Sequence, residues 1–265
     1  EVGNKEWLAT NIRKGYMYMA DVVTDPRWFR IYEAFGEDPT QVGDIAYELI
    51  KGFQGDEIDE QSIALTIKHF PGGGARENGF DPHYEEGKYN VYPTEGRLAK
   101  YHLPAFARAF EANPSSVMPY YAIPSNDKSA MPQAPFDEES FEFEEIAFAY
   151  NHDIVTKLLR EHMEFDGYVN SDTGVLGKMA WGAEHLTEPE RVQKMLEAGT
   201  DIVSGAYEVT PFIEAFQQGL VSEERINLSL ARLFKEMFNL GIFDNPYVDV
   251  AAADEIVDTE ESREL

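Results

Sequence analysis

The chain has 265 residues, 43% of them hydrophobic, which is enough to bury one large core. It carries 49 acidic and 22 basic side chains, and a net charge of −27 argues against binding to nucleic acid or to an anionic membrane surface. The absence of cysteine excludes disulfides and thiol chemistry, and no apolar run is long enough to span a bilayer.

Short apolar runs alternate with longer amphipathic stretches along the chain, a pattern that favours a parallel α/β architecture. The chain begins at Glu1 rather than Met and opens with a helix-like segment at residues 6–13, so we expect an N-terminal segment to be missing or processed. Five segments then have the composition of buried strands, namely residues 16–23, 63–70, 116–121, 167–172 and 201–204. Pro119 cannot donate to a strand ladder, so we expect the third strand to be irregular near its end.

Three later stretches predict helices. Residues 142–164 have apolar side chains at helical spacing. Residues 187–199 begin with a Thr-Glu-Pro-Glu capping box and end at a glycine, and residues 222–240 lie between a capping serine and a glycine. We expect all three helices to pack against the sheet. The apolar stripe of the last one consists of Ile226, Leu230, Leu233, Phe234 and Met237.

Two connections are unusually long. Residues 71–93 are rich in glycine, charged and aromatic residues, and residues 122–137 are rich in proline and polar residues. Both follow predicted strands, and in a (β/α)8 barrel such loops build the active-site face at the carboxyl ends of the strands. Five strands are too few to close that barrel. We therefore expect a (β/α)8 TIM-type barrel that lacks its first βα unit or units in this chain.

Polar side chains gather where the predicted strands end. They are Arg30 beyond the first strand, Lys68 and His69 at the end of the second, Tyr121 after the third and Asp172 after the fourth. An aspartate on a rigid strand end beside cations stays ionised at neutral pH and is a competent nucleophile toward an anomeric carbon. The two cations and His69 can donate hydrogen bonds to sugar hydroxyls, and Tyr121 can orient the carboxylate.

Other chemistries have weaker support in the sequence. No Ser-His-Asp motif, Walker loop or dinucleotide fingerprint is present, and the run Gly72-Gly73-Gly74 lacks the Lys-Ser/Thr of a phosphate-binding loop. His69 and His83 have no tight cluster of metal-ligating residues around them. We therefore expect neither a metal nor a cofactor.

Seven motifs occur in a fixed order along nearly the whole chain, among them Lys68-His69-Phe70-Pro71-Gly72 and Asn170-Ser171-Asp172. The others lie at residues 25–28, 35–39, 117–121, 198–201 and 241–247. Together they resemble glycoside hydrolase family 3, the β-glucosidase and exo-glucanase family. The resemblance implies a retaining, exo-acting β-glycosidase that releases the non-reducing terminal β-glucosyl unit of an oligosaccharide or of an aryl or alkyl β-glycoside.

Residue by residue, the resemblance implies that Asp172 is the catalytic nucleophile that forms the glycosyl-enzyme. Arg30, Lys68 and His69 would bind hydroxyls of the terminal sugar, and Tyr121 would sit beside the nucleophile. Residues 1–247 would be the N-terminally incomplete catalytic barrel, and residues 248–265 a linker toward an absent C-terminal α/β sandwich domain. A homodimer and a secreted or periplasmic location are both compatible with this family.

The acid/base residue has two candidate sources. Retaining hydrolysis needs a second carboxyl group about 5–5.5 Å from the first, and in many family members the second domain supplies it, which is the source we favour. The β-N-acetylglucosaminidases of the family instead use an Asp–His pair in the loop after Lys-His-Phe-Pro-Gly, and Asp81-Pro82-His83 has that spacing here. The Gly-His-Gly with which that loop begins is replaced by three glycines. A third alternative is a carbohydrate-binding barrel without catalysis.

One position departs from the family in the expected sugar site. Thr173 stands where the family usually has a tryptophan that clamps the bound sugar. We expect another aromatic residue to replace it, and the candidates in the long loop are Tyr84, Tyr89 and Tyr92.

Overall fold

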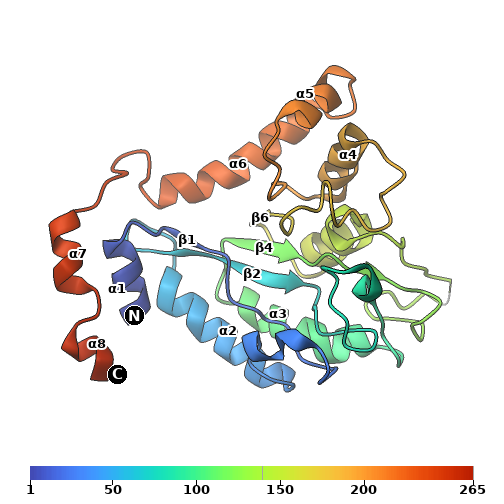
Figure 1. The fold of residues 1–265 in the computed structure, drawn as a ribbon, viewed down its shortest axis with the longest axis horizontal. Helices are drawn as coiled ribbons and strands as arrows, with labels where there is room; N and C mark the ends of the chain where they lie inside the picture. The colour runs from blue at the N-terminus through green and yellow to red at the C-terminus, as the bar shows by residue number, and fades with distance from the viewer. Residues whose placement is uncertain (139, 265) are drawn as a thin grey trace.

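Figure 1 shows a computed structural model of the protein, which describes residues 1–138 and 140–264. Its centre is a parallel sheet with strands in the order β1 (Lys14–Gly15), β2 (Ala64–Phe70), β4 (Ser116–Pro119) and β6 (Tyr168–Val169). A bridge between Asn170 and Ile202 adds a fifth parallel position. The predicted parallel α/β class is confirmed, and strands adjacent in sequence are neighbours in space, as in a barrel wall. Within the described residues the sheet is open and does not close into eight strands.

The predicted strand at residues 16–23 is wrong in position. The ladder forms earlier, at Lys14–Gly15, and resumes only as a single bridge between Met19 and Lys68. Three residues lie between Gly15 and Met19 whereas two lie between Leu65 and Lys68, so one extra residue bulges out of the first strand and interrupts its pairing. The strand predicted at residues 201–204 is likewise reduced to the bridge at Ile202.

The two long loops follow β2 and β4, as expected, and they also pair with each other. Strand β3 (Tyr89–Asn90) in the first loop runs parallel to β5 (Ile123–Pro124) in the second. An isolated antiparallel bridge between Arg76 and Asn90 ties the first loop to itself. This second, two-stranded sheet was not predicted, and it holds both loops above the carboxyl ends of the central strands.

The helices with strong local signals lie where the sequence predicts them. Helix α4 (Glu188–Ala198) begins with the Thr187 capping box and ends at Gly199, whose φ of 106° is in the left-handed region that glycine tolerates. Helix α6 (Glu223–Asn239) is capped by Ser222, which accepts a hydrogen bond from the Arg225 backbone nitrogen. The N-terminal helix α1 (Val2–Ala9) begins four residues before the predicted segment.

The single helix predicted over residues 142–164 is wrong. The structure has a 3₁₀ turn at Phe148–Tyr150 and a separate π-type helix at Asp153–His162. Asn151 divides them, because it is extended and its side chain caps the second helix by accepting a hydrogen bond from the Ile154 nitrogen at 3.1 Å. The chain before the turn is not helical, and Phe143 there packs among the loop aromatics.

The remaining helices cover the sheet from different sides (Figure 1). Helices α2 (Pro39–Gln54) and α3 (Leu103–Phe110) pack together on one side, while α4, α5 (Thr210–Gln217) and α6 lie on the other. Helices α7 (Val250–Ile256) and α8 (Glu260–Glu264) follow at the C-terminal end, where α7 packs against α1. Short helical turns lie at Phe29–Glu33, Glu85–Gly87 and Leu98–His102. Within the described parts of the chain, no helix is both long enough and apolar enough to cross a bilayer.

Helix α6 packs inward only part of the apolar stripe that we expected to lie on the sheet: Ile226 is partly buried against the core, and no member of the stripe is fully buried. Leu230 and Phe234 are 39% and 40% exposed, whereas the buried residues of the helix are Ser229 and Glu236. Polar contacts explain the orientation, because Glu236 accepts hydrogen bonds from the side chains of Lys14 and Ser115 at the base of the sheet. These charged contacts turn the polar side of the helix inward.

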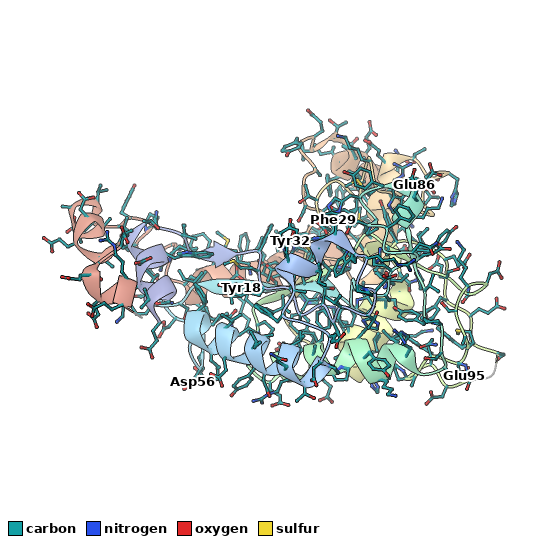
Figure 2. All side chains as sticks on the ribbon, turned by 60° about the horizontal axis from the view of Figure 1, so that its bottom comes forward. Tyr18, Phe29, Tyr32, Asp56, Glu86 and Glu95 are labelled. Atoms are coloured by element: carbon teal, nitrogen blue, oxygen red, sulfur yellow. The ribbon has the colours of Figure 1, made fainter. Side chains whose placement is uncertain are left out.

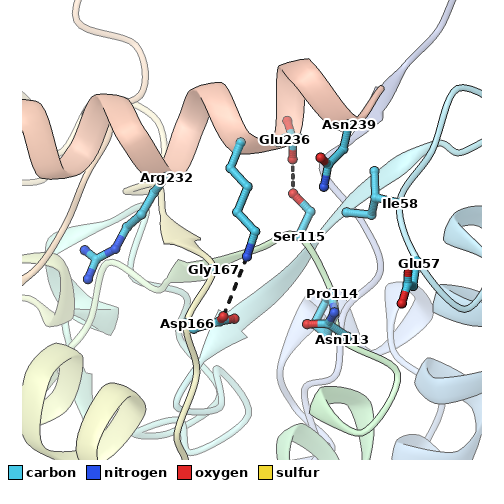
Figure 3. A pocket seen from close by; sticks show the side chains of 11 residues that line it. Glu57, Ile58, Asn113, Pro114, Ser115, Asp166, Gly167, Arg232, Glu236 and Asn239 are labelled. Atoms are coloured by element: carbon cyan, nitrogen blue, oxygen red, sulfur yellow. Dashed lines mark hydrogen bonds and ion pairs between the residues drawn. The ribbon is translucent and has the colours of Figure 1, made fainter. Parts of the chain in front are cut away.

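A cavity of about 420 Å³ lies beside this polar base (Figure 3). It is lined by residues that directly precede β4 and β6, including Ser115 and Gly167, and by Glu236 and Asn239 of α6. It therefore opens at the amino ends of the strands, opposite the predicted site. In parallel barrels this end serves stability rather than chemistry, so we assign no catalytic role to it.

The buried His102 makes stability depend on pH. Burial and the nearby Arg97 lower the pKa of His102 to about 3, below the ordinary histidine value of 6.5. Between pH 6.5 and about 3, the unfolded chain therefore binds a proton at this position and the folded chain does not. Folding stability consequently falls as the pH decreases through that window. Between pH 5 and 6, urea unfolding should show a loss of stability of about 1 kcal/mol per pH unit from this residue alone.

The His102→Leu variant should lose that much of the pH dependence, since it removes the proton site and keeps a buried side chain. His185→Leu is the matched control, because His185 is exposed. Equal slopes for the wild type and His102→Leu would contradict this account of the buried imidazole.

Candidate active site

The structure brings the five predicted site residues together at the carboxyl ends of the strands. Lys68 and His69 belong to the last part of β2, Tyr121 and Asp172 follow β4 and β6, and Arg30 lies on the turn Phe29–Glu33. The His69 ring connects the cluster, since its Nε2 lies 3.2 Å from Arg30 Nη1 and 3.7 Å from Asp172 Oδ2.

Asp172 lies at the floor of this cluster and is 8% exposed. Its Oδ1 accepts a hydrogen bond from the Thr173 backbone nitrogen at 2.7 Å, while Oδ2 faces His69. The Tyr121 hydroxyl donates to the Thr173 carbonyl oxygen at 2.8 Å, so it fixes the backbone beside the nucleophile candidate. Burial and the negative charge of Asp172 raise the pKa of Tyr121, which therefore stays protonated.

Two cations belong to the cluster around this carboxylate, Lys68 through its charge and Arg30 through the His69 ring. Arg30 donates through Nε and Nη2 to Glu33, at 3.1 and 2.6 Å, and through Nη1 to the Tyr120 hydroxyl at 3.1 Å. Burial and the neighbouring Arg30 lower the pKa of Lys68, while the charges of Asp172 and other carboxylates oppose that shift. The site thus keeps positive groups beside a partly buried anion, an arrangement suited to binding hydroxyl groups around an electrophilic carbon.

Three further residues of the site were not predicted from the sequence. Asp21 is fully buried and accepts hydrogen bonds from His69, Glu33 pairs with Arg30, and Tyr120 donates to Asp81 at 2.6 Å. A signal for Asp21 does exist, because an acidic residue inside an otherwise apolar segment needs a buried partner. No local feature of the sequence predicts that Tyr120 pairs with Asp81.

The Asp81 and His83 pair also reaches this face. Asp81 is buried and accepts hydrogen bonds from Trp28 Nε1 at 2.8 Å, from the Tyr120 hydroxyl and from His83 Nδ1. Burial opposes ionisation of Asp81, but these hydrogen bonds outweigh it and hold the pKa of Asp81 well below its ordinary value. The His83 side chain is 40% exposed, and its ring lies 4.6 Å from that of Tyr121. His83, and not Asp81, is therefore the member of the pair that a substrate could meet.

The three tyrosines that we considered as replacements for the family tryptophan differ in how exposed their rings are. Tyr92 is buried in the core, and Tyr89 is covered by the cations of Lys88 and Lys128. Tyr84 is exposed. Figure 2 adds Tyr32, which is 76% exposed on the turn that carries Arg30.

Metal ligation has no support in the described part of the chain. Within residues 1–138 and 140–264, no group of three or more histidine, aspartate or glutamate side chains could hold a metal ion.

Comparison with known proteins identifies relatives that all point to one family. Residues 1–235 match the family model described as glycosyl hydrolase family 3 N terminal domain. The chain is 40% identical over 267 residues to the probable β-glucosidase C of Aspergillus oryzae, covering 97% of this chain and 39% of that protein. It is 32% identical over 278 residues to the periplasmic β-glucosidase/β-xylosidase of Dickeya chrysanthemi, covering 97% and 41%. The chain thus spans about two fifths of the length of these curated relatives.

Solved structures agree with this comparison. The β-glucosidase from Listeria innocua in complex with isofagomine has a TM-score of 0.79 at 27% identity, over 100% of this chain and 34% of that one. An exo-1,3/1,4-β-glucanase from Pseudoalteromonas sp. has a TM-score of 0.80 at 23% identity, over 99% of this chain and 39% of that one, and shows the fold alone.

Proposed function

The chain belongs to glycosyl hydrolase family 3, and we propose that it is the nucleophile-bearing part of a retaining, exo-acting β-glycosidase. The observation that supports this most is the Asp172 carboxylate, partly buried at the carboxyl ends of the strands beside Arg30, Lys68 and His69. The proposed substrate is the non-reducing terminal β-glucosyl unit of an oligosaccharide or of an aryl or alkyl β-glycoside. Relatives named β-glucosidase support that choice.

In the proposed reaction, Asp172 Oδ2 attacks the anomeric carbon and the bond from that carbon to the leaving oxygen breaks. The leaving oxygen takes a proton from a general acid, and a glycosyl ester of Asp172 remains. Water activated by the same group then displaces Asp172, so two inversions give net retention. Lys68 would bind sugar hydroxyls, and Arg30 would exchange its weak contact with the Met19 sulfur, at 3.5 Å, for a hydroxyl oxygen.

We propose that the general acid is a carboxyl group of a second domain, connected through residues 248–264. The share of the curated relatives that lies outside the match supports this. Residues 1–247 would themselves be part of a (β/α)8 barrel. A secreted or periplasmic location is supported by the relative named periplasmic.

The loop pair Asp81 and His83 is the second candidate for the acid/base. It is favoured by the contact of the His83 ring with Tyr121, the residue beside the nucleophile candidate. Asp81 would orient the imidazole through Nδ1, and Nε2 would carry the transferred proton.

The His83→Ala variant separates the two schemes. Under the second-domain scheme it should leave hydrolysis within about twofold of wild type, because the ring contributes only packing. Under the loop scheme, substrates with basic leaving groups should lose about 10²- to 10⁴-fold, while dinitrophenyl glycosides, whose leaving group needs no proton, should lose little. Tyr84→Ala is the matched control on the same loop, and rates on glucosides and N-acetylglucosaminides should be compared for both variants.

The stereochemical course tests the proposal itself. Proton NMR of early hydrolysis of an activated aryl β-glucoside should show β-glucose first, followed by slow mutarotation. Initial release of α-glucose would overturn the retaining mechanism. If the chain instead binds the glycoside without ever cleaving it, the alternative of a non-catalytic carbohydrate-binding barrel holds.

A further inference from the structure

Asp21 is the most completely enclosed carboxylate near the site. It is fully buried two residues beyond the Met19 bridge, and each of its hydrogen-bond partners is a donor. Oδ2 accepts from the His69 backbone nitrogen at 3.0 Å and from His69 Nδ1 at 2.8 Å, and Oδ1 accepts from the Gly73 nitrogen. Three donors around one carboxyl group favour its ionised form.

Charge agrees with this geometry. Burial opposes ionisation of Asp21, but the hydrogen bonds from His69 and Gly73 and the positive charge of Arg30 outweigh it, so the pKa of Asp21 lies below its ordinary value. Gly73 is required for this approach, because an added Cβ would stand 2.8 Å from Asp21 Oδ1 and 2.9 Å from the Tyr120 ring.

The other side of the imidazole fixes its tautomer. Nε2 lies 3.2 Å from Arg30 Nη1, and a guanidinium group can only donate, so Nε2 must accept. The proton of neutral His69 is therefore on Nδ1, which donates a hydrogen bond to Asp21 Oδ2. The 3.7 Å between Nε2 and Asp172 Oδ2 is too long for a hydrogen bond, so His69 does not donate to the nucleophile candidate.

This tautomer in turn orients Arg30. All five N–H groups of the guanidinium have an acceptor: two bond to Glu33, and one each to His69, the Tyr120 hydroxyl and the Met19 sulfur. The Tyr120 hydroxyl then donates to Asp81. Two directed chains of hydrogen bonds thus start at Arg30: one runs through His69 to Asp21, and the other through Tyr120 to Asp81.

We infer that Asp21 is a positioning residue, which holds His69 as the Nδ1–H tautomer so that Nε2 can fix the Arg30 guanidinium beside Asp172. It touches no substrate and acts only through His69. The inference rests on the proposed glycosidase function for its catalytic consequence, but the tautomer itself is independent of activity.

The Asp21→Leu variant tests this at similar size. Its side chain accepts no hydrogen bond, so the Nδ1–H group of His69 loses its acceptor. Nothing then holds the proton on Nδ1, and a proton that moves to Nε2 is set against the Arg30 N–H. Labelling of Asp172 by an activated 2-fluoro-β-glucoside, a step that needs no general acid, should slow by roughly 10²-fold, since small displacements of positioning groups have effects of this order.

The experiment combines that rate with nitrogen-15 NMR of the imidazole ring in the whole chain. In the wild type, His69 should show a proton-bearing Nδ1 and a proton-free Nε2 from pH 6 to 8, and Asp21→Leu should lose this pattern. Asp25→Leu is the matched control, because Asp25 is a nearly buried carboxylate four residues away that bonds to Arg27 instead.

A proton on Nε2 in wild-type His69 would overturn the inference even if the variant failed to fold. An unchanged tautomer and labelling rate in folded Asp21→Leu would overturn it as well. Wild-type protein that has the Nδ1–H tautomer but is never labelled at Asp172 would instead contradict the proposed function and leave the role of Asp21 in orienting His69 supported.

Discussion

Replacing Asp172 by asparagine should abolish glycoside cleavage, with a loss of roughly 10⁴-fold or more in kcat for an activated aryl β-glucoside. The carboxylate is the only group in the proposed mechanism that bonds to the anomeric carbon, and an amide of the same size is a far weaker nucleophile. The fold should survive, because the hydrogen bond that Asp172 accepts from the neighbouring Thr173 nitrogen can also be accepted by an asparagine oxygen. Release of dinitrophenolate measures the rate directly.

A control and a rescue sharpen this prediction. Asp166→Asn, at an exposed carboxylate before β6, should keep wild-type turnover. The Asp172→Ala variant should regain turnover in azide and release the α-glucosyl azide, since the small anion attacks from the vacated side with one inversion. Residual wild-type activity in Asp172→Asn, or a β-azide product, would remove Asp172 from the nucleophile role.

The second large effect concerns stability. Asp201→Ala should lower the free energy of unfolding by about 3–5 kcal/mol, because it removes one partner from a buried charge network. Asp201 Oδ2 accepts from Arg160 at 2.8 Å, and Oδ1 accepts from Arg232 at 2.9 Å and from Arg225 at 3.2 Å. Burial lowers the pKa of Arg160 to about 10, so its charge already lies in an unfavourable environment even with this partner present. Urea unfolding at pH 7 measures the loss.

The position of the network explains the size of the effect. Asp201 Oδ2 also accepts from the Val169 backbone nitrogen in β6, and Oδ1 accepts from Ser229 on α6, so one carboxylate connects the sheet to the last long helix. The surface pair Asp166 and Lys235, 3.8 Å apart, is the control, and Asp166→Ala should change stability by at most about 1 kcal/mol. A loss below about 1 kcal/mol in Asp201→Ala would show that the three arginines find other partners or water.

The sequence predicts best those parts of the fold that local signals determine. The caps of α4 and α6 lie within a few residues of the helices that they begin, and both helices appear where expected. The stretch at residues 142–164 has helical spacing as well, but Asn151 divides it, and Phe143 and Ile146 enter the core from non-helical backbone. Periodicity alone does not separate these cases.

The candidate site likewise contains some residues that the sequence predicts and others that it does not. Residues at strand ends, such as Lys68 and Asp172, are predictable because the carboxyl ends of parallel strands meet at one face. Asp21 and Tyr120 are not, since their roles come from contacts with His69 and Asp81, which lie 48 and 39 residues away along the chain. Such pairs depend on how two loops and two strands are packed, which no single segment encodes.

The central claim is that Asp172 forms a covalent bond to the sugar, and labelling of the wild-type chain tests it most directly. Incubation with a 2-deoxy-2-fluoro-β-glucoside carrying a dinitrophenolate leaving group should add one glycosyl unit without help from a general acid. Proteolysis and mass spectrometry should then find that unit on Asp172. A label on any other residue, or none at concentrations that saturate the site, would contradict the account.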